Sequence, residues 1–163
     1  MDTKILKYLP ALVICLLIST ALSCSSSGSG SDTTDIKFEV IKEGVISGFT
    51  DEKLMVIDNN TDYQKIMSIV YYNLDQMPII PEVDFTKNTL ILAAIGAKNT
   101  GGYSIGINNI KSNGSVTISI TEISPGKNCV LTESVISPYQ LVKVKKIKKE
   151  VSFSTSRIVK DCP

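Results

Sequence analysis

The sequence predicts an α+β fold, mainly antiparallel β-sheet with one amphipathic helix at about residues 60–74. Three observations support this class. Several short segments alternate apolar and polar residues, which is typical of half-buried strands. One segment carries apolar residues at helical spacing. An Asn113-Gly114 pair lies between two of the alternating segments, and this pair is the strongest short signal for a hairpin.

The first half of the chain contains two predicted strands and the helix. One strand begins near Ile36, and a short apolar strand covers residues 54–57. The helix follows, with Thr61 and Gln64 at the spacing of a capping box. Its apolar stripe indicates core packing rather than a binding face. The stripe consists of Tyr63, Ile66, Met67, Val70, Tyr71 and Leu74.

The second half is predicted to contain strands alone. Residues 88–96 form a buried strand, and residues 103–110 pair with a return strand through 116–120 across Asn113-Gly114. Residues 140–147 and 151–157 are interpreted as a last hairpin that turns at 148–150. Runs of strands with a single helix favour an α+β fold with antiparallel pairing.

The first 23 residues have the features of a secretory signal. Lys4 and Lys7 precede an apolar run, which closes on small residues before Cys24. A cysteine at that place predicts a bacterial lipoprotein whose Cys24 thiol is acylated. The alternatives are an ordinary signal peptide and a spanning helix, but a span needs about 20 apolar residues. We therefore expect an extracytoplasmic protein, lipid-anchored in the cell envelope, in the outer membrane if the host has one.

Three parts are predicted: a lipoprotein signal peptide at 1–23, a Ser/Gly-rich tether at 24–35 and a single domain at 36–163. Removal of the signal takes Lys4, Lys7 and Asp2 from the 17 basic and 16 acidic residues, which leaves a formally neutral chain. A neutral chain lacks the basic excess of nucleic-acid-binding proteins, so no nucleic-acid partner is expected.

Two cysteines remain once the signal and the lipid site are set aside. Cys129 and Cys162 are a pair in an oxidising compartment, which predicts a disulfide between them. Two free thiols or a soft-metal pair are the alternatives.

No enzymatic activity is expected. The chain has no histidine, which excludes the Ser-His-Asp and Cys-His arrangements. Neither a Ser-Lys dyad nor a carboxylate pair has a recognisable motif. Residues 58–62 resemble the opening of a calcium loop, but Tyr63 and Ile69 stand where that loop needs glycine and glutamate. No catalytic residue, cofactor or metal is therefore predicted.

The one charge run consists of five lysines between residues 143 and 149. They suit a strand with one wet face, and lysines on an edge strand block edge-to-edge aggregation. The second interpretation is a basic patch for an acidic partner or anionic headgroups.

Further motifs lie between residues 81 and 146. Gly101-Gly102 stands before a strand, where glycines suggest a bulge or a close approach, and Ser137-Pro138 precedes the last strands. In these motifs the chain resembles the PrcB-like family, the C-terminal domain of the protease complex subunit PrcB. The motifs are Pro81-Glu-Val-Asp84-Phe85, Gly96 to Ile105 with its Gly-Gly-Tyr-Ser-Ile block, Pro125-Gly126 and Ser137-Pro138-Tyr139.

The resemblance implies a small, non-catalytic exported domain associated with a cell-surface protease complex. We therefore expect a protein-binding module that stabilises or docks to a partner protein, such as an exported protease. The partner contacts are predicted around Gly101, Gly102, Tyr103, Pro138 and Tyr139. The alternative function is a protease inhibitor that inserts the loop 123–129 into an active site, since proline and a flanking disulfide would stiffen that loop.

Overall fold

The computed structural model describes residues 33–72 and 74–162. The predicted signal peptide, Cys24 and most of the predicted tether lie outside the described residues. The elements are β1 (Thr34–Asp35), β2 (Phe38–Gly44), β3 (Lys53–Ile57), α2 (Asn60–Val70), β4 (Asn88–Ala94), β5 (Ser104–Asn113), β6 (Ser115–Pro125), β7 (Tyr139–Lys145) and β8 (Val151–Lys160).

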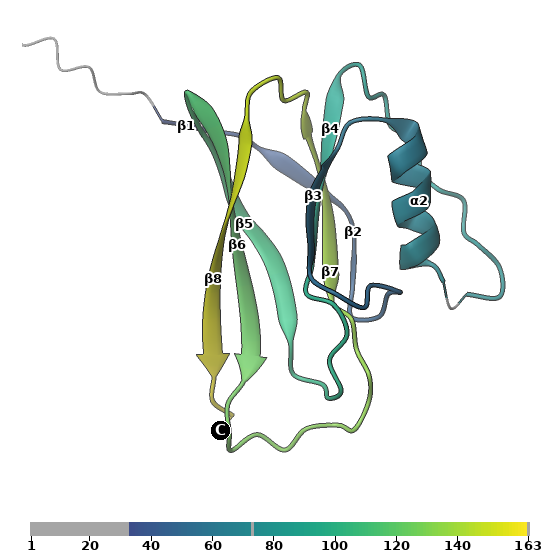
Figure 1. Cartoon of the computed structure of the whole chain (residues 1–163), viewed down its shortest axis with the longest axis vertical. Coiled ribbons are helices and arrows are strands. Elements are labelled where there is room, and N and C mark those ends of the chain that lie inside the picture. Colours follow the sequence, from purple (N-terminus) through teal and green to yellow (C-terminus); the bar gives the residue numbers. More distant parts are fainter. Residues whose placement is uncertain (1–32, 73, 163) are drawn as a thin grey trace, which may run out of the picture. The chain divides into compact units, whose positions relative to one another are not determined.

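The strands form two four-stranded sheets. The first has the order β2-β7-β4-β3 and is antiparallel throughout. The second has the order β1-β5-β6-β8, antiparallel except where β8 runs parallel to β6. Figure 1 shows α2 on one side of the first sheet and the second sheet on its other side. The predicted α+β class, dominated by antiparallel sheet, is confirmed.

The first sheet is the middle layer, so its central strands are buried on both faces. Along β4, Leu90 and Leu92 face the cluster under α2, whereas Ile91 faces the cluster between the sheets. Along β7, Leu141 and Val142 divide in the same way. This explains why residues 90–95 form a continuous apolar run, because a strand covered on both faces has no wet side.

The second sheet has one buried and one solvated face. Val116, Ile118 and Ile120 of β6 are buried between the sheets, while Thr117 and Ser119 are partly exposed. This alternation is the period-2 pattern expected of such a sheet. The predicted Asn113-Gly114 hairpin is confirmed, with Gly114 at a positive φ of 73°.

Gln140 of β7 links the two sheets. A register shift in β5 leaves Asn108 as an extra residue, and the neighbouring Ile107 N–H donates to Gln140 Oε1 at 2.7 Å. Gln140 Nε2 in turn donates to Glu43 Oε2 at 2.8 Å. A bulge disturbs a strand ladder, and here a side chain of the other sheet supplies a partner for the ladder's backbone.

The N-cap of helix α2 lies two residues before the predicted cap. Asn59 is the N-cap; its side-chain oxygen accepts from Asp62 N at 2.9 Å, and its Nδ2 donates to Asp62 Oδ2 at 2.8 Å. Asparagine satisfies an unpaired helix N–H better than threonine does, so the predicted Thr61 cap is wrong. The helix also ends earlier than predicted, at Val70, and near this end the Ile69 carbonyl accepts from Gly48 N at 2.8 Å.

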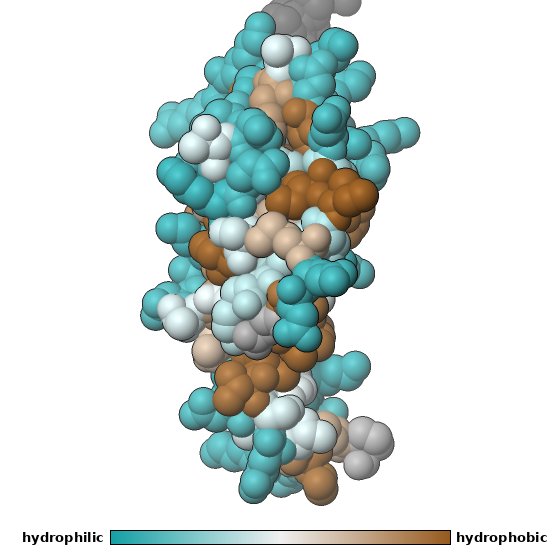
Figure 2. All heavy atoms as spheres, turned by 90° about the vertical axis from the view of Figure 1, so that its right-hand side faces the viewer, coloured by the Kyte–Doolittle hydropathy of each residue, from teal (hydrophilic) through white to brown (hydrophobic). Residues whose placement is uncertain are grey.

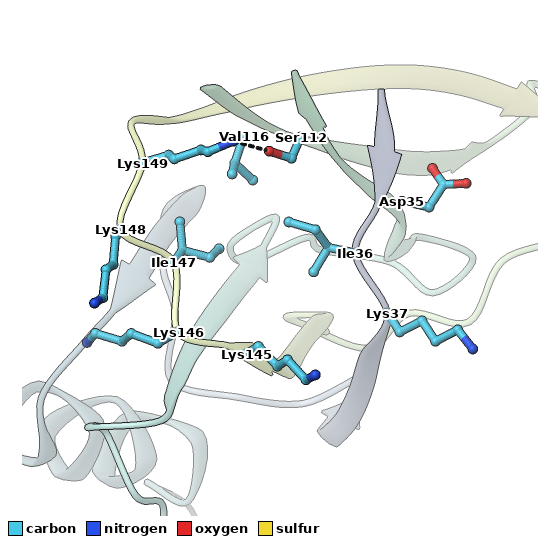
Figure 3. A pocket seen from close by; sticks show the side chains of 10 residues that line it. All are labelled: Asp35, Ile36, Lys37, Ser112, Val116, Lys145, Lys146, Ile147, Lys148 and Lys149. Carbon is cyan, nitrogen blue, oxygen red and sulfur yellow. Dashed lines mark hydrogen bonds between the residues drawn. The ribbon is translucent and has the colours of Figure 1, made fainter. Parts of the chain in front are cut away.

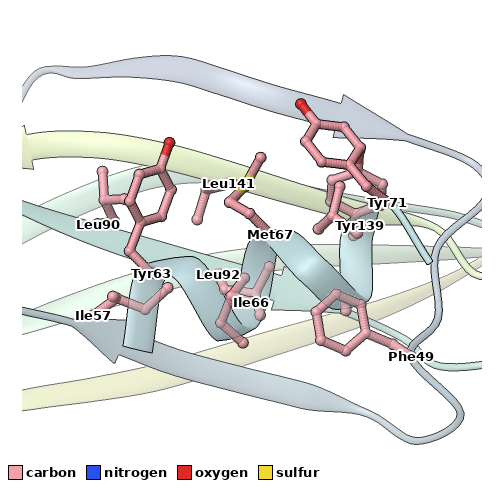
Figure 4. Packing of buried hydrophobic residues seen from close by; sticks show 12 residues of the cluster. Phe49, Ile57, Tyr63, Ile66, Met67, Tyr71, Leu90, Leu92, Tyr139 and Leu141 are labelled. Atoms are coloured by element: carbon pink, nitrogen blue, oxygen red, sulfur yellow. The ribbon is translucent and has the colours of Figure 1, made fainter. Parts of the chain in front are cut away.

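The stripe on α2 packs on the first sheet, as Figure 4 shows. Tyr63 is fully buried, and its ring meets Phe85 edge-on at 5.9 Å between centroids. Its hydroxyl has no hydrogen-bond partner within the described part of the chain. Burial, reinforced by nearby Tyr71, raises the pKa of Tyr63 above its usual value of 10.0. The stripe therefore serves the core, as predicted, except for Leu74, which lies beyond the helix and is 52% exposed. Within the described residues, no helix is long and apolar enough to cross a bilayer.

Two predictions about the last strands are wrong. β7 and β8 do not form a hairpin, since β7 lies in the first sheet and β8 pairs with β6 in the second. β7 is also not an edge strand, because it lies between β2 and β4. Its lysines therefore cannot prevent edge-to-edge aggregation, because the strand has no free edge. Lys143 instead pairs with Glu39 of β2 at 2.8 Å.

Asp84 is expected to make stability depend on pH in the acid range. The Thr86 hydroxyl, then Lys87 and the Thr86 N–H, stabilise the carboxylate and lower the pKa of Asp84 from 3.8 to about 2. A depressed folded-state pKa gives stability that is present above pH 4 and lost as the pH falls towards 2. Asp84→Asn should therefore melt below the parent at pH 7, and the gap should close between pH 4 and 2. Thermal melts across this range measure the gap, and a gap that stays constant would contradict the assignment.

Candidate functional site

Three loops meet at one end of the sheets, and we call this surface the loop end. They are residues 45–52 between β2 and β3, 95–103 between β4 and β5, and 126–138 between β6 and β7. In Figure 1 they lie in the lower part of the view. Within the described residues, no cluster of three or more Cys, Asp or Glu side chains has the geometry to hold a metal ion.

Backbone hydrogen bonds join the three loops. Lys98 and Ile136 exchange two bonds, of 2.8 and 2.9 Å, as an isolated antiparallel bridge. Gly101 N donates to Thr132 O at 3.1 Å, which extends the contact between the second and third loops. The first loop joins them through two more bonds, Ala97 N to Thr50 O at 3.1 Å and Ser137 N to Val45 O at 2.9 Å.

Two buried hydroxyls lock this arrangement. Ser47 Oγ donates to the Ser137 carbonyl at 2.8 Å, and Ser137 Oγ donates to the Phe49 carbonyl at 2.6 Å. Both serines are buried. Removing one hydroxyl would leave a buried partner unsatisfied, which is costly. These bonds hold the first and third loops against each other.

Apolar side chains stand out into solvent on this framework. Ile46, Tyr72 and Val135 are 59%, 59% and 66% exposed, and they line a hollow of about 410 Å³. Val45, beside them in sequence, is also exposed. Figure 2, which faces the α2 side, shows hydrophobic residues in the lower part, where the loop end lies, as well as higher up. Apolar groups gathered on a surface mark sites of interaction with other molecules.

The predicted contact residues divide into two groups. Pro138 and Tyr139 are buried, and burial raises the pKa of Tyr139 to about 12. They therefore serve the core and offer no surface. Gly101, Gly102 and Tyr103 lie at the loop end; Gly102 is exposed, and the Lys98 ammonium sits 5.6 Å from the centroid of the Tyr103 ring.

A second hollow, of about 460 Å³, lies beside the two glycines. Gly102, Pro125 and Leu131 line it, together with Cys162 near the end of the chain. The predicted disulfide is confirmed: Cys129 is bonded to Cys162. This bond links the third loop to the segment after β8. Cys162, which lines the second hollow, is therefore covalently attached to the third loop.

Arg157 of β8 places charge on the flank of the loop end. Its Nε donates to Glu122 Oε2 at 3.0 Å, and its Nη2 donates to Glu52 Oε2 at 3.1 Å. The Glu122 hydrogen bond, followed by the attraction of both carboxylates, raises the pKa of Arg157. Arg157 thus joins β8 to the last residue of the first loop, directly before β3.

Sequence reasoning missed Ile46, Tyr72 and Val135. They come from three segments far apart in the chain and form no motif. The signal available was modest: Val45-Ile46 is an apolar pair between two glycines, in a segment that otherwise has the composition of a turn.

The similarity to known proteins falls on the second and third loops and the strands beside them. The family model described as PrcB C-terminal matches residues 89–145, which run from β4 to the end of β7 and include both of these loops. No curated protein and no solved structure gives a significant match to the chain. Residues 89–145 of the chain are thus similar to the PrcB C-terminal family.

Proposed function

We propose that the protein is a lipid-anchored, extracytoplasmic, non-catalytic binding module, and that its loop end docks to an exported protease complex and stabilises it. The observation that carries the proposal is the exposure of Ile46, Tyr72 and Val135 around one hollow on a rigid set of loops. The family name, which comes from a protease complex subunit, supports a protein partner of this kind.

The rigidity of the loops favours docking. Binding costs free energy when flexible groups must be ordered, and loops already held in the bound conformation reduce that cost. Here the Ser47 and Ser137 hydroxyls and the Lys98–Ile136 bridge fix the framework. Tyrosine is also among the residue types that dominate binding energy at interfaces, and the Tyr72 ring is exposed at the rim.

The geometry favours docking over the inhibitor function. An inhibitory loop presents free backbone to its protease, whereas Ile123–Pro125 belong to β6 and pair with β8. The remaining residues of the segment form a tight turn, closed by Cys129 N donating to Gly126 O at 3.2 Å. Little of the segment is therefore free to enter an active site.

Crosslinking on intact cells, followed by purification of the acylated protein, tests the proposal. We expect a protease to be recovered in stoichiometric amount and to be degraded faster when this protein is deleted. Its catalytic rate with the purified module should stay unchanged, whereas an inhibitor would lower it. The mass of the N-terminal peptide tests acylation of Cys24 separately. Recovery of lipid without protein would count against the docking role.

The docking surface has its own prediction. Ile46→Ser, Tyr72→Ser and Val135→Ser combined should weaken partner binding by about 30-fold or more, the usual effect of losing an interface hot spot. The melting temperature should stay close to that of the parent, because all three side chains are more than half exposed. Quantitative pull-down with the recovered partner measures the loss.

The matched control is Ile79→Ser, which removes an apolar side chain that is 96% exposed and lies outside the three loops. It should bind the partner as the parent does. Equal binding by the triple variant and the parent would move the docking surface elsewhere.

A further inference from the structure

A basic hollow of about 580 Å³ lies at the opposite end of the sheets from the loop end, and we call it the basic groove. It is bounded by the residues that follow β1 and by the segment between β7 and β8. Figure 3 shows Ile36 and Ile147 on opposite sides of the hollow, with lysine side chains around it. Five of its ten lining residues are lysines, and Asp35 is the one acidic residue among them.

Four of the lysines carry charge that no carboxylate among the described residues balances. Lys146 pairs with Asp58 at 2.8 Å, and Lys149 donates to Ser112 Oγ at 2.9 Å. Like Lys149, the lysines at 37, 145 and 148 form no salt bridge in the described part of the chain. The groove therefore presents a surplus of positive charge over an apolar floor.

An apolar floor inside a ring of ammonium groups matches the chemistry of an anionic lipid at a bilayer surface. The phosphate of the headgroup would meet the ammonium groups, and the less polar glycerol region would meet Ile36, Val116 and Ile147. Lysine near an anionic surface contributes about fivefold per residue to binding. An acidic peptide would satisfy the lysines, but it gives no account of the apolar floor.

The position of the groove supports the same occupant, and this step rests on the proposed acylation of Cys24. Ile36 and Lys37 line the groove directly after β1. Residues 25–33 alone separate Cys24 from β1. A Ser/Gly-rich chain of that length spans about 15–18 Å, so the groove would stay close to the membrane surface.

We propose that the basic groove binds the headgroups of anionic phospholipids in the membrane to which the chain is anchored. β7 runs from the loop end at Tyr139 to the groove at Lys145. A bilayer held at the groove therefore leaves the loop end facing away from the lipid, open to a protein partner.

The test is lysine acetylation, read by mass spectrometry, on the full acylated protein in vesicles. One vesicle population contains phosphatidylcholine alone, and the other also contains phosphatidylglycerol. We expect acetylation of Lys145, Lys148 and Lys149 to slow about fivefold or more in the anionic vesicles only. Lys127, at the loop end, should react equally in both. Added salt should restore reactivity, since screening weakens attraction at a charged surface.

Two variants of equal charge make the test specific. Lys37→Gln, Lys145→Gln and Lys148→Gln combined should abolish the protection of Lys149. The control removes three lysines at the other end, with Lys53→Gln, Lys127→Gln and Lys160→Gln combined, and should keep it.

Several results would overturn the proposal. Equal acetylation in the two vesicle populations would exclude an anionic lipid. Protection in detergent by soluble glycerol phosphate would indicate a small-anion site, and protection by polyglutamate but not by anionic vesicles would indicate an acidic protein. If Cys24 proves not to be acylated, co-flotation of the protein with vesicles replaces the acetylation test. The protein should then float with anionic vesicles and not with neutral ones. Flotation with neither would then reject the groove.

Discussion

Replacing Gly102 by alanine is expected to lower the free energy of unfolding by about 2–5 kcal/mol. Gly102 has a φ of +90°, a conformation that costs a residue with a Cβ atom about 1–2 kcal/mol. An added Cβ would also lie 3.0 Å from Pro125 Cβ and 3.1 Å from Leu131 Cδ2. Crowding of this kind adds about 1–3 kcal/mol. Urea unfolding of the parent and the variant measures the difference.

Gly114→Ala is the matched control. Gly114 also has a positive φ, of 73°, but an added Cβ would meet nothing within 4 Å. It should cost about 1–2 kcal/mol, from the backbone alone. The excess loss at Gly102 then measures how tightly the loop end is packed. If the two variants lose equal stability, Pro125 and Leu131 move aside for the added Cβ at no cost in free energy. That result would contradict tight packing around the second hollow.

Loss of the disulfide is expected to have a similar or larger effect. Cys129 and Cys162 are 33 positions apart, and closing a loop of that size restricts the unfolded chain by about 3–4 kcal/mol in the chain-entropy model. The double variant Cys129→Ser, Cys162→Ser should therefore unfold at a lower urea concentration. Folded domains are stable by only about 5–15 kcal/mol, so this is a large share of the total.

A reducing agent supplies the control for this prediction. Reductant should destabilise the parent to the level of the double variant and should leave the double variant unchanged. If the parent loses no stability on reduction, the bond does not limit the unfolded chain. In that case the third loop is held by its backbone contacts, such as the Lys98–Ile136 bridge, without help from the covalent link.

Much of the fold could be predicted because side-chain alternation reports which faces of a strand are buried. The pattern around Val116, Ile118 and Ile120 located β6, and the Asn-Gly pair located its hairpin. The same pattern does not report which strand lies alongside. β8 alternates as a hairpin partner of β7 would, yet it crosses to the second sheet and runs parallel to β6. Pairing of that kind is decided by the packing of whole layers.

The site was harder to predict for a related reason. Gly101 and Gly102 were found because glycine has a local backbone meaning. Tyr139 was misjudged, since a tyrosine after a proline has the same local sequence whether it is exposed or buried. Here β7 is a central strand of the middle layer, so Tyr139 is buried. Ile46, Tyr72 and Val135 meet because the first and third loops converge with the segment that follows α2, and no local pattern encodes that meeting.

The pairing of β2 with β7 has a consequence for how the chain folds. β2 is near the start of the domain, and the strand that it needs, Tyr139–Lys145, is near its end. The first sheet therefore cannot close until most of the chain has been made, and β8 must still find β6 afterwards. Long loops have to close before these contacts form, which slows folding to milliseconds or seconds. The domain can therefore reach its complete fold only after its last strand has been synthesised.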